Sequence, residues 1–255
     1  MKKVKVSDFL KEMKESFFKK LDESYLDEAG RKLVKRATCF AIVAHHGQNR
    51  VSGEPFIRHS IAVAELLLEI GRSAEEIAAG TLHDVVEDTQ IIIAEIEKEF
   101  GAKIAFFVDG MTKVFKDEDI KEIERIFGPQ VAFAVRESID VAAGKTLPLV
   151  EADAIYRAKL FTMVQEDHLL VFIRLADRLH NMRTLEFLSV WKQKSVAKET
   201  LEFHLPLANL FLSSEELRLI KPWLKELVSL SHKYLQPNSQ TSRAQRSTSP
   251  CLSAI

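Results

Sequence analysis

The chain has 255 residues, 46% of them hydrophobic, so it can bury the core of one large domain or of two small ones. Its formal net charge of −1 excludes a global field that would attract nucleic acid or an anionic membrane. Only Cys39 and Cys251 are present, so the sequence predicts no disulfide framework and fits a reducing compartment.

Residues 1–20 begin with lysines, as a secretion signal does. Charged residues such as Asp8, Lys11 and Glu12 interrupt the apolar stretch that a signal needs. The remaining apolar residues instead predict an amphipathic helix. Because no apolar stretch approaches membrane-spanning length, we expect a cytoplasmic protein that binds neither membrane nor nucleic acid.

Apolar residues recur at intervals of three and four along nearly the whole chain, which predicts an all-α fold. The segments with this spacing are residues 33–43, 61–70, 75–88, 93–107, 158–163, 197–211 and 217–235. Residues 169–176 could form a strand on periodicity alone, but their continuation to residue 188 favours a long buried helix. Residues 237–255 are rich in Ser, Thr and Gln, which predicts a disordered tail after a folded domain of residues 1–236.

The chain contains an internal repeat. Residues 95–108 and residues 122–135 are identical at eight of fourteen positions, with a shared Phe-Gly break. A partial tandem duplication explains this match better than chance similarity between amphipathic helices. The polar stretch 109–113 that follows the first copy is not kept after the second, so we place no chemistry in the second copy.

Four ionisable residues, His83, Asp84, Glu87 and Asp88, interrupt the otherwise apolar segment 77–88. A buried charge is costly unless it is paired or bound to a metal. If the segment is one helix, His83 and Glu87 lie one turn apart, and so do Asp84 and Asp88. One turn could then bind a cation while the next contacts a water on that cation, which suits metal-assisted hydrolysis.

Three other segments carry polar residues that a core would not choose. A loop rich in Gly and Pro ends at His59, which opens an apolar helix, and an ordinary helix-start residue is an equal reading. Asp177 follows a strongly apolar run and shares a helix face with Asn181, so it needs a metal or an arginine as partner. Lys113, at an expected helix end, is available for a phosphate or is simply solvated.

The candidate metal ligands are therefore two imidazoles and two carboxylates, from His59, His83, Asp84 and Asp177. Mixed nitrogen and oxygen ligands suit Mn²⁺, Zn²⁺ or Fe²⁺ better than Ca²⁺, which prefers oxygen alone. The absence of thiolate ligands argues against a structural zinc site.

Four motifs together carry a family resemblance: H-x-G-Q-x-R-x-S-G-E-P-F-I-x-H (45–59), H-D-V-V-E-D-T (83–89), D-G-x-T-K (109–113) and L-A-D-R-L-H-N-M-R-T-L (175–185). Over roughly residues 30 to 235 the chain resembles the hydrolase domain of the RelA/SpoT homologue family. This is a helical domain of the HD superfamily that degrades the alarmones ppGpp and pppGpp. The chain is similar to a hydrolase-only form, or to a fragment of a longer protein with a synthetase domain.

The resemblance also implies a role for individual residues. It implies that the four candidate metal ligands bind Mn²⁺ and that Glu87 and Asp88 are a pair that activates water. It also implies that Arg50 and Ser52 contact guanine and that Asn181 and Thr184 contact the nucleoside. The chain departs from the family by a longer stretch between Lys113 and Tyr156, and we expect a duplicated insertion at about residues 117–150.

The expected reaction is hydrolysis of the 3′-diphosphate of ppGpp or pppGpp, which releases pyrophosphate and GDP or GTP. Glu87 or Asp88 would orient the attacking water or take its proton, and Lys113 would meet the developing negative charge. Two alternatives remain open. One is an HD phosphohydrolase for another nucleotide such as NADPH, and the other is a non-catalytic alarmone-binding module. The sequence does not predict the oligomeric state.

Overall fold

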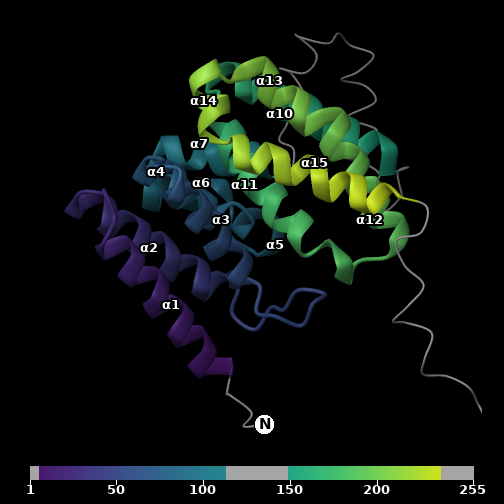
Figure 1. Ribbon diagram of the computed structural model, residues 1–255. Coiled ribbons are helices and arrows are strands. Elements are labelled where there is room, and N and C mark those ends of the chain that lie inside the picture. The colour runs from purple at the N-terminus through teal and green to yellow at the C-terminus, as the bar shows by residue number, and fades with distance from the viewer. Residues whose placement is uncertain (1–5, 113–148, 237–255) are drawn as a thin grey trace, which may run out of the picture.

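The computed structural model describes residues 6–112 and 149–236, and its regular elements are helices (Figure 1). The first range contains α1 (Val6–Asp22), α2 (Glu28–Ala44), α3 (Ile57–Glu69), α4 (Ala74–Leu82), α5 (Val85–Asp88), α6 (Ile93–Phe100) and α7 (Ala102–Met111). The second contains α10 (Leu149–Glu166), α11 (Leu170–Arg183), the 3₁₀ turn η1 (Leu185–Phe187), α12 (Val190–Glu199), the π-helical turn η2 (Thr200–His204), α13 (Leu205–Phe211), α14 (Ser214–Leu219) and α15 (Lys221–Leu235). The predicted all-α fold is confirmed. Among the described helices, none combines the length and apolarity that crossing a membrane requires.

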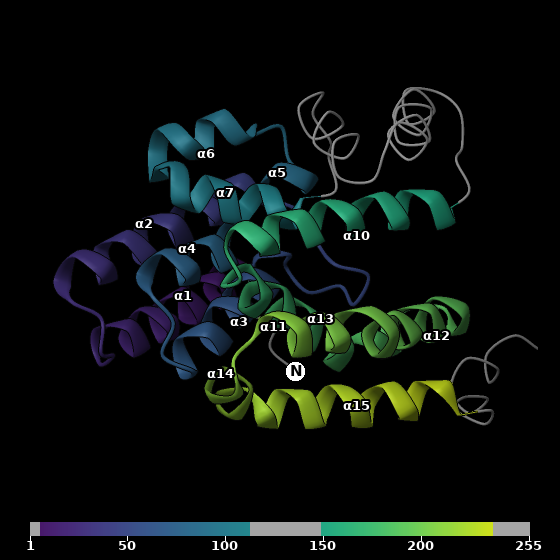
Figure 2. The same cartoon turned by 90° about the horizontal axis from the view of Figure 1, so that it is seen from above.

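Helix α11 runs through the middle of the domain (Figures 1 and 2). It packs against α3, α4 and α7 of the N-terminal half and against α10, α13 and α15 of the C-terminal half. Its apolar residues, among them Phe172 and Ile173, are fully buried, which confirms the long buried helix and excludes the strand. Because α11 is covered all round, its charged residues Arg174 and Asp177 are buried too and must find partners.

Side chains of α3 pack directly onto Gly80 of α4. A Cβ atom placed on Gly80 would lie 2.5 Å from Cδ1 of Leu67 and 3.3 Å from Cγ1 of Val63, so a larger residue at this position would have to displace the Leu67 side chain. The start of α4 is set by a capping box, in which Ser73 and Glu76 each accept a hydrogen bond from the other's backbone N–H. Both features help to hold α4 in place, and His83 and Asp84 lie at its C-terminal end.

Two predicted helices are interrupted, and both interruptions lie beside the candidate site. The predicted continuous helix 75–88 is wrong, because α4 ends at Leu82 and α5 begins at Val85. Between them Asp84 has φ −94° and ψ −6°, in the bridge region that many active-site residues occupy. The predicted helix 197–211 is broken by the π-helical turn η2.

The first copy of the repeat forms α6 and α7, which join at the Phe-Gly break, where Gly101 has φ 89°. Only glycine adopts this conformation without strain. The second copy, nearly all of the expected insertion 117–150 and the expected tail 237–255 lie outside the described residues. The duplication and the domain limits therefore stay predictions.

Candidate metal centre and adjoining pocket

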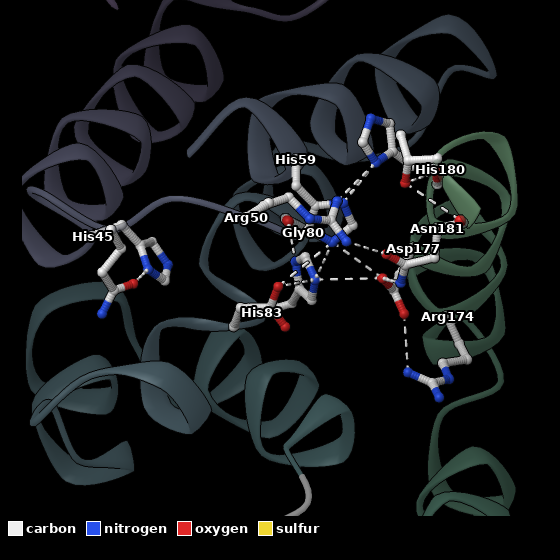
Figure 3. A network of polar contacts seen from close by, with 12 residues as sticks. His45, Arg50, His59, Gly80, His83, Arg174, Asp177, His180 and Asn181 are labelled. Carbon is white, nitrogen blue, oxygen red and sulfur yellow. Dashed lines mark hydrogen bonds and ion pairs between the residues drawn. The ribbon is translucent and has the colours of Figure 1, made fainter. Parts of the chain in front are cut away.

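Three of the four candidate ligands converge on one point inside the domain. His59 lies in the first turn of α3, His83 at the end of α4 and Asp177 in the middle of α11, and all three are buried (Figure 3). One ligand atom from each lies within 4.8 Å of the others. Nε2 of His59 is 3.1 Å from Nε2 of His83 and 3.2 Å from Oδ1 of Asp177. Three separate helices thus bring two imidazoles and a carboxylate together.

Asp84 lies at the edge of this group. Its Oδ2 is 3.0 Å from Nε2 of His83 and 3.5 Å from Nε2 of His59. Its side chain is 21% exposed, so it lies on the solvent side of the three buried ligands. This position suits a fourth ligand, and its role as a ligand stays a prediction.

Hydrogen bonds around the two imidazoles decide which nitrogen carries a proton. Nδ1 of His83 lies 2.8 Å from the carbonyl oxygen of Gly80, which can only accept, so this Nδ1 donates. Nδ1 of His180 lies 3.3 Å from Nη1 of Arg50, which can only donate. Burial, together with His59 and Arg50, lowers the pKa of His180 to about 3, so its ring is a neutral acceptor. Nδ1 of His59, 2.7 Å from Nδ1 of His180, must therefore donate to it.

Both ligand imidazoles consequently turn Nε2 toward the centre of the cluster, where they meet carboxylate oxygens. Burial lowers the pKa of His59, which favours a neutral ring. Burial also opposes a charge on His83, but the neighbouring Asp84 and Asp177 outweigh it and raise the pKa of His83 well above its usual value. The carboxylates that attract a proton to this Nε2 also attract a metal cation, so the proton and the cation compete for the same nitrogen. The residues present therefore fit a divalent cation held by nitrogen and oxygen.

Asp177 is held in place from two sides. Nδ2 of Asn181 donates to its Oδ1 at 2.5 Å, and Nη1 of Arg174 donates to its Oδ2 at 3.0 Å. Burial disfavours charge on Asp177, yet His59, His83 and Arg174 together hold its pKa well below the usual value. The ionised carboxylate is thus oriented and satisfied, as a metal ligand's partners normally ensure. The predicted shared helix face of Asp177 and Asn181 is confirmed.

A cavity of about 270 Å³ adjoins the metal centre, and Arg50, Ser52, Glu87, Asn181 and Thr184 all line it. Nη2 of Arg50, a predicted guanine contact, donates a hydrogen bond of 2.6 Å to Oδ1 of Asn181, a predicted nucleoside contact. These placements agree with the predicted roles, which remain untested.

The rest of the prediction fits the cavity less well. Asp88 is not among the lining residues, although its backbone carbonyl accepts a hydrogen bond from Nε2 of Gln48. Glu87 is therefore the better placed of the acidic pair. Lys113 lies outside the described residues, so the structure does not test its role.

Several charged residues that the sequence analysis did not select also line the cavity: Arg174, Arg178, Lys192 and Glu199. Arg174 interrupts an apolar run three residues before Asp177, a signal that could have identified it. Lys192 and Glu199 belong to α12 and reach the cavity through tertiary packing, which leaves no local pattern in the sequence.

Glu199 and Arg178 belong to a second buried polar cluster in the cavity wall. Nη2 of Arg178 donates to Oε2 of Glu199 at 2.9 Å and also to Nε2 of His204. The π-helical turn brings His204 to this point, and such turns are frequent at functional sites. Burial and then Arg178 lower the pKa of His204 well below its usual value, so the ring is neutral.

Known proteins have sequences similar to this chain. The sequence profile of the HD domain family matches residues 37–210. The chain is 40% identical over 208 residues to a probable guanosine-3′,5′-bis(diphosphate) 3′-pyrophosphohydrolase of Synechocystis sp., covering 81% of this chain and 23% of that protein. It is 34% identical over 235 residues to a protein of the same name, without "probable", from Borreliella burgdorferi, covering 92% and 30%.

Other relatives carry the name of a synthetase. A putative chloroplastic GTP diphosphokinase of Arabidopsis thaliana is 42% identical over 188 residues, covering 73% of this chain and 19% of the relative. The chain thus spans about a fifth to a third of the length of these relatives. A solved structure described as a metazoan ortholog of SpoT that hydrolyses ppGpp superposes with a TM-score of 0.50 at 20% identity. The superposition covers 84% of this chain and 99% of the solved chain, and at this identity it is evidence for the fold and not for the function.

Proposed function

The chain belongs to the HD-domain family and carries an HD domain of the RelA/SpoT type, and from this premise we propose that it hydrolyses ppGpp and pppGpp at the 3′-diphosphate with Mn²⁺. The observation that carries the proposal is the orientation of His59 and His83. Both imidazoles direct Nε2 at the carboxylate of Asp177, in a buried cluster that opens onto a cavity.

The names of the relatives support the substrate class but divide between hydrolase and synthetase. The site favours hydrolysis, because its buried histidines and carboxylates suit a catalytic metal ion with an open position. When bound, Mn²⁺ would supply a lowered pKa for water and a positive charge beside the phosphoryl oxygens. His59, His83 and Asp177 would hold it, with Asp84 as the fourth ligand.

The chain's own residues would then manage the water and the nucleotide. Glu87 is exposed at the cavity and would orient the attacking water and accept its proton. The water oxygen bonds to the phosphorus attached to O3′, the bond from that phosphorus to O3′ breaks, and O3′ takes up a proton. Pyrophosphate leaves, and GDP or GTP remains.

The nucleoside would lie along the part of the cavity wall that Arg50 and Asn181 form beside the metal ligands. We assign the guanine to Arg50 and Ser52 and the remainder of the nucleoside to Asn181 and Thr184, all of which line the cavity. Arg50 and Asn181 are already hydrogen-bonded to each other, so they would contact the substrate as a preformed pair.

Product analysis tests this function. The purified protein is incubated with ppGpp or with NADPH in Mn²⁺, and parallel samples contain EDTA. We expect GDP and pyrophosphate from ppGpp, and no product in EDTA. Release of phosphate from NADPH with ppGpp untouched would assign the site to another nucleotide. Tight ppGpp binding without turnover would make the chain a binding module.

A further inference from the structure

We propose that Arg174 is a catalytic residue that donates hydrogen bonds to the phosphoryl oxygens of the 3′-diphosphate, an inference that rests on the proposed function. A cation beside the metal would favour the reaction, because negative charge on the oxygens of the attacked phosphorus must be stabilised while water attacks and the bond to O3′ breaks. Arg174 occupies the place where such a cation would act.

The position of Arg174 is the first support. It lies one turn before Asp177 on α11 and lines the same cavity as Glu87 and Asp84. Its Nη1 lies 3.0 Å from Oδ2 of Asp177 (Figure 3), so the guanidinium lies beside the metal centre. It is close enough to Glu87 for the two side chains to interact electrostatically. It therefore shares the cavity with the residue that would hold the metal and the residue that would orient the water.

The second support is that the guanidinium is held rigidly. Its central carbon lies 4.9 Å from the centre of the Tyr156 ring, so the aromatic face covers one side. The side chain is 9% exposed, and Asp177 fixes one of its two terminal nitrogens. A donor that is already oriented gains its full interaction with the transition state without reorganisation.

The third support is unused hydrogen-bonding capacity. A guanidinium has five N–H donors. Nε of Arg174 is buried and has no hydrogen-bond partner within the described part of the chain. A buried donor without a partner is costly, and a ligand that accepts a hydrogen bond from it would remove that cost. Burial works against the charge of Arg174, but Tyr156 and the carboxylates of Asp177, Glu199 and Glu87 outweigh it and raise its pKa, so the guanidinium stays charged.

The charge of the cavity is the fourth support. Its lining contains four basic side chains, Arg50, Arg174, Arg178 and Lys192, and four acidic ones, Asp84, Glu87, Asp177 and Glu199. Arg178 already donates to both Glu199 and His204, whereas the hydrogen bonds of Arg174 within the described residues go to Asp177 alone. A cation bound at the metal centre would draw on the charge of Asp177 and leave Arg174 available to an anion.

The alternative is that Arg174 only holds Asp177, and the experiment separates the two roles. Arg174→Lys keeps the charge and Arg174→Met removes it. Arg72→Met is the matched control, because Arg72 is also paired with a carboxylate, that of Glu76, and stacked on an aromatic ring, that of Phe172, but does not line the cavity. Turnover of ppGpp is expressed per bound Mn²⁺, and methylene diphosphonate, a non-hydrolysable pyrophosphate analogue, is titrated calorimetrically into each Mn²⁺-loaded protein.

For Arg174→Met we expect kcat per bound metal to fall by about 10²-fold or more, the scale of a lost transition-state donor. We also expect at least about tenfold weaker diphosphonate binding, since a charge-assisted contact is lost. Arg174→Lys should recover part of the turnover and part of the diphosphonate affinity, and Arg72→Met should change neither quantity. If Arg174→Met loses Mn²⁺ but turns over normally per bound metal, or binds the diphosphonate like the parent, the proposal is overturned. If the parent protein leaves ppGpp intact, it is the proposed function that fails.

Discussion

Nδ1 of His59 lies 2.7 Å from Nδ1 of His180, and the guanidinium of Arg50 makes His180 the acceptor of that pair. His180 would not touch the metal, yet it decides which nitrogen of His59 faces the metal centre. The hydrogen bonds from Arg50 to His180 and from His59 to His180 thus connect the expected nucleotide pocket to His59, a candidate metal ligand. A change at His180 should therefore alter metal binding while all ligands remain.

Replacing His180 by Phe removes this acceptor and leaves the proton of His59 free to move to Nε2. We expect the dissociation constant for Mn²⁺, measured by titration calorimetry, to rise by about 10- to 100-fold, as for other partners of ligand histidines. His180→Asn keeps an acceptor and should lose less. His168→Phe is the control, because His168 is exposed and pairs with Glu216. Unchanged affinity in His180→Phe would show that the proton of His59 is set by another contact.

Glu87 and Asp84 should separate chemistry from metal binding. Glu87→Gln keeps the volume and removes the base, so we expect it to retain Mn²⁺ and ppGpp binding while turnover falls by roughly 10²-fold or more. Asp84→Asn removes a charged side chain 3.0 Å from Nε2 of His83 and should lower the metal content itself. Elemental analysis of both variants makes the comparison. Parental turnover in Glu87→Gln would shift the role of base to Asp88.

Deleting residues 117–143 should leave metal binding intact. The ligand candidates belong to α3, α11 and the turn after α4, and none lies in this stretch. The deletion removes the second repeat copy, in which we place no chemistry. The measurement is the Mn²⁺ content of the deletion variant, with circular dichroism to establish that it is folded. A folded variant without Mn²⁺ would show that the insertion belongs to the site.

His204 should make stability depend on pH. Burial and Arg178 keep its folded pKa well below 6.5, so the unfolded chain binds one more proton than the folded one below about pH 6.5. The free energy of unfolding should therefore fall, as pH decreases from there toward the folded pKa, by about 1.4 kcal/mol per pH unit.

Urea unfolding of His204→Gln between about pH 7 and 5 isolates this contribution. The glutamine oxygen can still accept a hydrogen bond from Arg178, so the variant should fold. The slope of its free energy of unfolding against pH should be smaller than that of the parent by the contribution of about one proton. His232→Gln is the control, because His232 is exposed on α15. Equal slopes in the parent and His204→Gln would mean that His204 titrates alike in both states.

Much of the metal centre was predictable because buried charge is expensive. His83 and Asp177 stand in apolar runs, so each needed a partner, and the structure brings them together. The same reasoning applies to Arg174, whose position in LLVFIRLA carries an equal signal that the sequence analysis did not use. That these groups serve one site came from the resemblance, since no local pattern reports which buried charges meet.

The helix limits and the far wall of the cavity were less predictable. Periodicity extended α4 through Asp88, since the spacing of apolar residues does not register the local change of ψ at Asp84 that ends the helix. Lys192 and Glu199 lie on a helix whose sequence looks like a solvated surface, and only the packing of α12 against α15, which itself packs on α11, turns them toward the cavity. Long-range packing of this kind has no signature within one segment.

Gly80 combines two constraints in a residue that has no side chain. Its missing Cβ lets Leu67 of α3 come close, and its carbonyl holds Nδ1 of His83. A mutation scan of this chain should therefore find Gly80 sensitive to substitution, although it contributes no ligand atom and has no reactive group. An added methyl group at Gly80 would push on Leu67, which belongs to the helix that carries His59, so a residue without a side chain bears on the positions of two candidate metal ligands.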